Sequence, residues 1–139
     1  MKLSRTVAYA VQATVQLAQS NSGLPVPCSH LAAEGRMPER FLLQILRHLV
    51  THGILRSTRG VDGGYSLERK PEEISLLDVM EAIDGPLSAT LPETEGGNPS
   101  PSETRLQEAL EQVAANLRRQ LHSIKLSDLL SSRPFAKLA

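Results

Sequence analysis

The sequence contains little cysteine and few aromatic residues, and it lacks long apolar runs. Its 139 residues include one cysteine, Cys28, no tryptophan and 3% aromatic residues. A single cysteine excludes a disulfide or a multi-cysteine metal site within one chain and is typical of a reducing compartment. No run reaches the roughly 18 apolar residues of a transmembrane helix. No apolar signal region follows the first residues, so we expect a cytoplasmic protein without membrane association.

With so few aromatic residues, leucine, valine, isoleucine and alanine must build the core, a composition that favours helices. The length suits one compact domain with an extension. The net charge is zero, but residues 1–70 contain nine Lys and Arg against four Asp and Glu, whereas residues 71–139 contain six against eleven. The basic half indicates that one end of the molecule meets a polyanion.

Residues 4–21 have apolar side chains at helical spacing and predict a first helix with Ser4 as its N-cap. Pro25 and Pro27 then predict an extended link. The next segments are a short helix over residues 29–34, a tight turn over 35–37 that contains a glycine, and a second helix from Pro38 to about residue 52. This succession is the helix-turn-helix pattern.

The helix predicted from Pro38 has two distinct faces. One face is apolar and consists of Phe41, Leu42, Ile45, Leu46 and Leu49. The opposite face is polar and carries Arg40, Gln44, Arg47 and Thr51, with Leu43 and His48 on its flanks. A helix of this kind fits the major groove of DNA, where its N-terminal residues reach the edges of the bases.

A small hairpin is predicted after the second helix. Residues 54–58 and 65–67 have strand character, and the glycine-rich residues 60–64 form the turn between them. A hairpin at this place is a wing. Ser75 then caps a helix over residues 76–84, which Gly85 and Pro86 end.

The last third of the chain predicts a loop over residues 87–100 and a long helix over 101–123, which begins at Ser100, Pro101 and Glu103. A short helix over residues 125–130 follows. An apolar stripe with spacings of three and four residues runs along the long helix: Leu106, Leu110, Val113, Leu117, Leu121 and Ile124. The stripe predicts a homodimer interface; the alternative is packing on the first helix within the same chain.

The predicted fold class is mainly α with a small β-hairpin. We divide it into a winged helix-turn-helix domain over residues 1–86, a flexible loop over 87–100, and a dimerisation helix with a C-terminal tail over 101–139. The partners expected are double-stranded DNA and a second copy of the chain, with an effector or partner protein left unspecified.

The DNA contacts expected follow from this arrangement. Four residues of the second helix lie near base edges: Glu39, Arg40, Leu43 and Gln44. Arginine pairs with guanine, glutamine with adenine, and leucine packs on the thymine methyl group. Arg47, deeper along the helix, suits a phosphate, as do Lys2 and Arg5 near the start of the first helix. In the wing, Arg59 suits a minor groove, and Gly63 and Gly64 allow the hairpin to approach the DNA backbone closely.

Other kinds of site have weaker support in the sequence. His48 and His52 are four residues apart, a spacing that can bind zinc, but no third ligand is evident. Cys28 lies at a helix start and is a candidate redox thiol, although a lone cysteine there is more often a small half-buried residue. No nucleophile–base set and no phosphate-cradling motif is present. We therefore expect neither an enzyme nor a bound cofactor or metal.

Several segments together resemble the Rrf-two (Rrf2) family of transcriptional regulators over nearly the whole chain. They are residues 1–4, Tyr9 with Ala10, residues 41–46 (FLLQIL), residues 55–65 (LRSTRGVDGGY) and residues 74–86 (ISLLDVMEAIDGP). The resemblance implies that the long helix forms a homodimer. It also implies that the dimer binds a roughly palindromic operator, usually as a repressor. It also implies that Arg59 enters the minor groove and that residues 39–44 read the major groove.

Two features depart from the family pattern. Members that carry an iron–sulfur cluster have three cysteines in the loop before the long helix, whereas residues 87–98 contain none. Leu43 stands where some members have glutamate, which leaves the preferred DNA sequence open. The alternatives to a cluster-free regulator are a protein-interaction module that retains the fold, and a redox sensor that uses Cys28.

Overall fold

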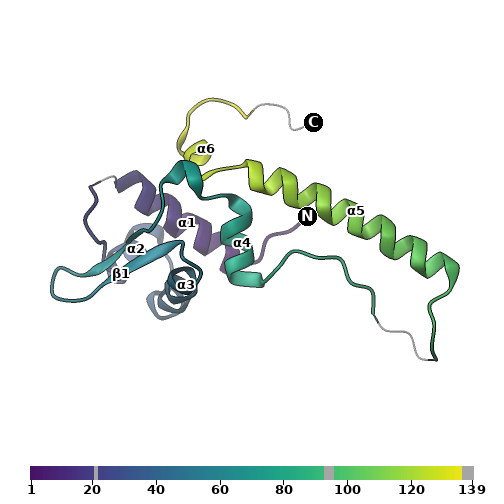
Figure 1. The fold of residues 1–139 in the computed structure, drawn as a ribbon. Coiled ribbons are helices and arrows are strands. Elements are labelled where there is room, and N and C mark those ends of the chain that lie inside the picture. The colour runs from purple at the N-terminus through teal and green to yellow at the C-terminus, as the bar shows by residue number, and fades with distance from the viewer. Residues whose placement is uncertain (21, 93–95, 136–139) are drawn as a thin grey trace.

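The computed structural model describes residues 1–20, 22–92 and 96–135. It contains two strands and several helices, and none of the described helices is both long and apolar enough to cross a membrane. The elements, in chain order (Figure 1), are α1 (Arg5–Ser20), α2 (Cys28–Gly35), α3 (Glu39–Thr51), β1 (Leu55–Thr58), β2 (Gly64–Leu67), η1 (Pro71–Glu73), α4 (Leu76–Asp84), α5 (Pro101–Ser123) and α6 (Leu126–Leu130).

The predicted fold class is confirmed. The helices over residues 76–84 and 101–123 have the predicted bounds, and the described ends of the other helices differ from expectation by at most one residue. The second helix of the helix-turn-helix, α3, begins one residue later than expected, because Pro38 is its N-cap and not its first helical residue. Parts of three predictions lie outside the described residues: Asn21 at the end of the first helix, residues 93–95 of the loop, and residues 136–139 of the tail.

Serine caps begin three of the helices, as the sequence predicts. The Oγ atom of Ser4 accepts a hydrogen bond of 3.1 Å from the backbone N–H of Val7. Ser75 and Ser100 each form a complete capping box with the acidic residue three positions later. Each cap satisfies backbone groups that the first turn of a helix leaves without partners.

The core is arranged around α1, which packs against α2, α3, α4, α6 and β2. Alanine, valine and leucine recur on the inner face of α1, and these small side chains let the surrounding helices approach closely. Four side chains of α3 lie in the same core and are fully or almost fully buried: Leu42, Ile45, Leu46 and Leu49.

The hairpin is antiparallel and pairs Leu55 with Leu67 and Thr58 with Gly64. A third segment joins it, because Val26 and Tyr65 exchange two backbone hydrogen bonds of 2.8 Å. The extended link predicted from the two prolines therefore borders the wing and attaches it to the beginning of α2.

The end of the chain returns to the core of the N-terminal domain. Leu126 of α6 is fully buried in the cluster that includes Ile74 and the inner face of α1. Its backbone N–H donates to the Ile74 carbonyl at 2.9 Å, and the Leu76 N–H donates to the Ile124 carbonyl at 2.8 Å. These contacts attach α6 to residues of the predicted DNA-binding domain.

Replacing Leu126 by alanine tests this placement of α6. Because Leu126 is 0% exposed and Leu130 of the same helix is 36% exposed, we expect Leu126→Ala to lower the free energy of unfolding by about 2–5 kcal/mol and Leu130→Ala by much less. Urea denaturation of both variants measures the difference. Equal losses would contradict the assignment of α6 to the core.

Candidate nucleic-acid interface

The turn between α2 and α3 depends on close packing against α1. Arg36 adopts the left-handed conformation at φ 53°, so the turn does not use its glycine for this purpose. A Cβ atom at Gly35 would lie 2.5 Å from Cε of Met37 and 2.9 Å from Nε2 of Gln12, so the ends of these two flexible side chains would have to move. The short connection is thus set by contacts with α1 as well as by its own sequence.

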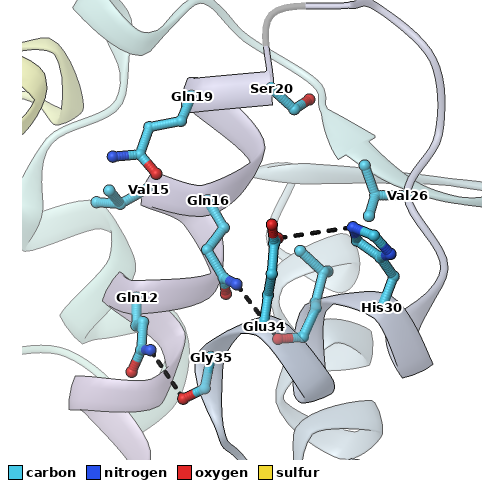
Figure 2. A pocket seen from close by; sticks show the side chains of 10 residues that line it. Gln12, Val15, Gln16, Gln19, Ser20, Val26, His30, Glu34 and Gly35 are labelled. Atoms are coloured by element: carbon cyan, nitrogen blue, oxygen red, sulfur yellow. Dashed lines mark hydrogen bonds and ion pairs between the residues drawn. The ribbon is translucent and has the colours of Figure 1, made fainter.

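Two glutamines of α1 hold the C-terminal end of α2. The Nε2 atom of Gln12 donates to the Gly35 carbonyl at 3.0 Å, and that of Gln16 donates to the Leu31 carbonyl at 3.3 Å. Figure 2 shows these bonds in the pocket between α1 and α2, beside the ion pair of His30 and Glu34. The Gly35 carbonyl belongs to the last turn of α2, where carbonyls have no partner within the helix. The sequence analysis missed both glutamines, because no motif marks a contact between residues so far apart.

The polar face of α3 points away from this packing. Arg40, Gln44 and Arg47 are exposed, as is Glu39, while Leu43 is half-buried at the edge of the face. On the opposite, apolar face, Phe41 is 39% exposed and lies outside the buried core. Its ring instead lies edge-on against Tyr9, with 6.0 Å between the ring centroids.

The arginines fall into two groups. Three form ion pairs within the chain: Arg56 with Glu68, Arg69 with Asp78, and Arg118 with Glu81. The hydrogen bond from Arg56 lowers the pKa of Glu68 below its ordinary value. Among the described residues, no such pair involves Arg40, Arg47 or Arg59, and all three are exposed. These three guanidinium groups are therefore available to bind phosphates or bases.

In the wing, the structure changes the role expected of two glycines. A Cβ at Gly63 would lie 2.2 Å from the Thr58 carbonyl oxygen, and one at Gly64 would lie 2.4 Å from the Val26 carbonyl oxygen. The protein's own backbone therefore requires both glycines, Gly63 for closure of the hairpin and Gly64 for the approach of the extended link. Arg59 is exposed beside them at the end of β1. Lys2 and Arg5 are also exposed, near the N-terminus of α1.

The apolar stripe of α5 is divided between two environments. Leu121 is 4% exposed because it packs with Val7, Leu77 and Met80, and Leu117 borders the same cluster. Leu121 therefore packs within its own chain, which is the alternative that the sequence leaves open for this stripe. Ile124 is half-buried where α5 ends. Leu106 and Val113 are 50% and 60% exposed, and Figure 1 shows this part of α5 projecting from the body of the molecule.

The histidines on α3 do not form part of a metal site among the described residues. Nδ1 of His52 lies 2.8 Å from the His48 carbonyl oxygen. No three His, Cys, Asp or Glu side chains converge to hold a metal ion in the part of the chain that the structure describes.

The fold and this exposed surface define a winged helix-turn-helix protein that binds DNA, and comparisons with known proteins agree. The family model Rrf2, described as an iron-dependent transcriptional regulator, matches residues 3–132. An HTH-type transcriptional regulator of Mycobacterium tuberculosis is 40% identical over 130 residues, which cover 93% of this chain and 81% of that protein. The chain belongs to the Rrf2 family of transcriptional regulators and is not an enzyme.

Solved structures show the same fold. CymR of Bacillus subtilis, the global cysteine regulator, has a TM-score of 0.77 and 25% identity, covering 96% of this chain and 99% of CymR. IscR of T. potens has a TM-score of 0.72 and 29% identity, covering 94% and 86%. These similarities extend over the long helix as well as over the DNA-binding domain.

The residues of this chain do not fit an iron–sulfur cluster of the kind held by several thiolates. Such clusters take most of their ligands from cysteine, and the chain has only Cys28. That residue lies on α2, away from the segment between α4 and α5, which has no cysteine.

Cys28 is also poorly suited to be a reactive thiol. Burial and the nearby negative charge of Glu39 raise the pKa of its thiol, and its Sγ atom lies 3.7 Å from the Glu39 carbonyl oxygen. A higher pKa leaves less thiolate, the form that reacts with oxidants and electrophiles.

The alkylation rate of Cys28 as a function of pH tests this environment. We expect the midpoint with iodoacetamide to lie above that of free cysteine, and Glu39→Gln to lower it because one source of negative charge is removed. The control is Glu34→Gln, because Glu34 lies on α2 with Cys28 but does not contribute to the raised pKa of the thiol. A midpoint below that of free cysteine would show instead that the thiol is activated.

Proposed function

We propose that the chain acts as a repressor that binds, as a homodimer, an operator with two inverted half-sites. The observation that carries this proposal is the exposed polar face of α3 beside Arg59 of the wing, with three arginines that have no ion pair among the described residues. Since a DNA-binding regulator acts where the DNA lies, we also propose that it works in the cytoplasm.

In the proposed complex, α3 enters the major groove. Its first residues, Glu39 to Gln44, face the base edges: Arg40 pairs with guanine, Gln44 with adenine, and Leu43 contacts the thymine methyl group. Arg47, with Lys2 and Arg5, binds phosphates. Arg59 enters the adjacent minor groove, where the negative potential attracts it.

The long helix supports the proposed homodimer. The exposed side chains Leu106 and Val113, with the half-buried Leu110, form an apolar strip that no described residue of the same chain covers fully. Burying such a strip against its copy removes apolar surface from water. A twofold axis through the interface relates the two α3 helices and predicts two inverted half-sites.

Arginine variants test the proposed docking. We expect Arg40→Ala and Arg59→Ala each to weaken binding to the DNA upstream of the gene by about tenfold or more, because each loses a contact to bases or a groove. Arg56→Ala is the matched control, because its guanidinium group is already paired with Glu68. Electrophoretic mobility shift at several salt concentrations measures the affinity, which should fall steeply with salt.

Unchanged affinity in both Arg40→Ala and Arg59→Ala would show that the docking is wrong. Failure of the wild-type protein to shift this DNA at low salt, together with recovery of a partner protein, would favour the interaction-module alternative.

A charge on the exposed strip of α5 tests the homodimer. We expect Val113→Asp to give a monomer in analytical ultracentrifugation without loss of fold, because Val113 is 60% exposed within one chain and an unpaired charge is costly to bury. The control is Gln112→Asp, at the preceding residue of the helix and outside the stripe; this variant should remain a dimer. A wild-type protein that is monomeric at micromolar concentration would contradict the proposal.

A further inference from the structure

A charged pocket lies where the DNA-binding elements meet α4 and the long helix. Its volume is about 430 Å³, near the lower end of the range for small-molecule sites. His52 at the end of α3 and Ile54 before β1 line one side, Arg69 follows the wing, and Asp78 and Glu81 of α4 and Arg118 of α5 complete the wall. Among the elements that border it are α3, α4 and α5.

The four charged side chains of the pocket already form two ion pairs. Arg69 binds Asp78 through Nη2 and Oδ2 at 3.2 Å, and Arg118 binds Glu81 through Nη1 and Oε2. Burial by itself raises the pKa of Asp78, but hydrogen bonds from Ser75 and Arg69 outweigh it and leave the pKa below its ordinary value. Asp78 is therefore ionised at neutral pH, and the pocket presents fixed charges of both signs.

Each pair uses only part of its hydrogen-bonding capacity. The Oδ2 atom of Asp78 accepts from Ser75 as well as Arg69, and the Oε2 atom of Glu81 accepts from the Leu87 N–H as well as Arg118. Within the described part of the chain, Oδ1 of Asp78, Oε1 of Glu81, and Nε and Nη2 of Arg118 have no hydrogen-bond partner. The pocket thus contains both hydrogen-bond donors and hydrogen-bond acceptors that are free to bind a ligand.

From this arrangement we infer that the pocket binds a small zwitterion of the size of a free amino acid. Its carboxylate is bound by Arg118 and its ammonium group by Asp78 and Glu81, while His52 lies at the rim with Nδ1 2.8 Å from the His48 carbonyl oxygen. An arginine suits the carboxylate because its guanidinium group presents several N–H donors in one plane. The existing ion pairs hold both charges in place before the ligand arrives, which lowers the cost of ordering them.

The position of the pocket gives the ligand a regulatory role, which rests on the proposed homodimer. The ligand contacts α3 through His52 and α5 through Arg118. It therefore stabilises one orientation of the recognition helix relative to the helix that joins the two copies. The distance between two half-sites on DNA is fixed, so a change of this orientation changes affinity for the whole operator.

Isothermal titration of the full chain without DNA tests the site. The probes are the common L-amino acids, and for each one that binds, the amine and the carboxylic acid that lack one charge; for L-alanine these are ethylamine and propionate. We expect at least one amino acid to bind with a Kd of about 1 mM or tighter. Both analogues should bind at least about tenfold more weakly, because each makes only one of the two charged contacts that the amino acid makes.

Two variants keep the test independent of folding. Arg118→Gln removes a pocket donor, and His52→Glu places a negative charge at the rim without breaking either ion pair. We expect each to weaken amino acid binding by about tenfold or more. The matched controls are Arg56→Gln and His48→Glu, whose side chains do not line the pocket, and they should bind as the wild type does.

The inference is overturned if no L-amino acid binds more tightly than about 10 mM, or if binding persists in both pocket variants. It is also overturned if either single-charge analogue binds as well as its amino acid. Mobility shift with the amino acid that binds then measures the regulatory role: affinity for DNA with two half-sites should change at least about threefold, with no change for one half-site. A chain that binds the amino acid but no DNA would contradict the proposed function and leave the site intact.

Discussion

Burial of one face of α3 against α1 is the constraint on which the rest of the structure depends. Leu42, Ile45, Leu46 and Leu49 are almost completely removed from water. Because helical residues three and four positions apart share a face, their burial directs Arg40, Gln44 and Arg47 outward. The surface proposed to bind DNA is therefore a consequence of the core. Gln12 and Gln16 strengthen the same arrangement, since they donate hydrogen bonds to the Gly35 and Leu31 carbonyls of the preceding helix.

The distribution of arginines separates residues that maintain the fold from residues free to act on a partner. Arg69 and Arg118 connect the base of the wing and α5 to α4. Arg40, Arg47 and Arg59 have no ion pair in the described structure, although their side chains are chemically identical to those of the paired arginines. Neither residue type nor local sequence makes this distinction. It arises because carboxylates from distant segments are brought next to some arginines and not to others.

The two parts of the long helix α5 lie in different environments. Its C-terminal part is anchored in a cluster with Val7, Leu77 and Met80, and the chain then turns so that Leu126 enters the main core. The rest of α5 extends from the body with Leu106 and Val113 exposed. Anchoring at one end gives the free part a defined direction relative to α3. Such a direction is what a dimer requires if its two recognition helices are to match two sites on one DNA duplex.

The sequence alone determined the helices, their serine caps, the glycine-rich hairpin and the polar face of α3, because each depends on residues within a few positions of one another. It also identified the family from short motifs. The tertiary structure alone decided that Phe41 lies at the surface, that Gly63 and Gly64 make room for the protein's own backbone, that Leu121 is internal and that α6 belongs to the core. The charged pocket has the same origin, since Glu81 and Arg118 are 37 positions apart. Local patterns specify which faces a segment has, but the element that covers each face is selected only when the whole chain packs.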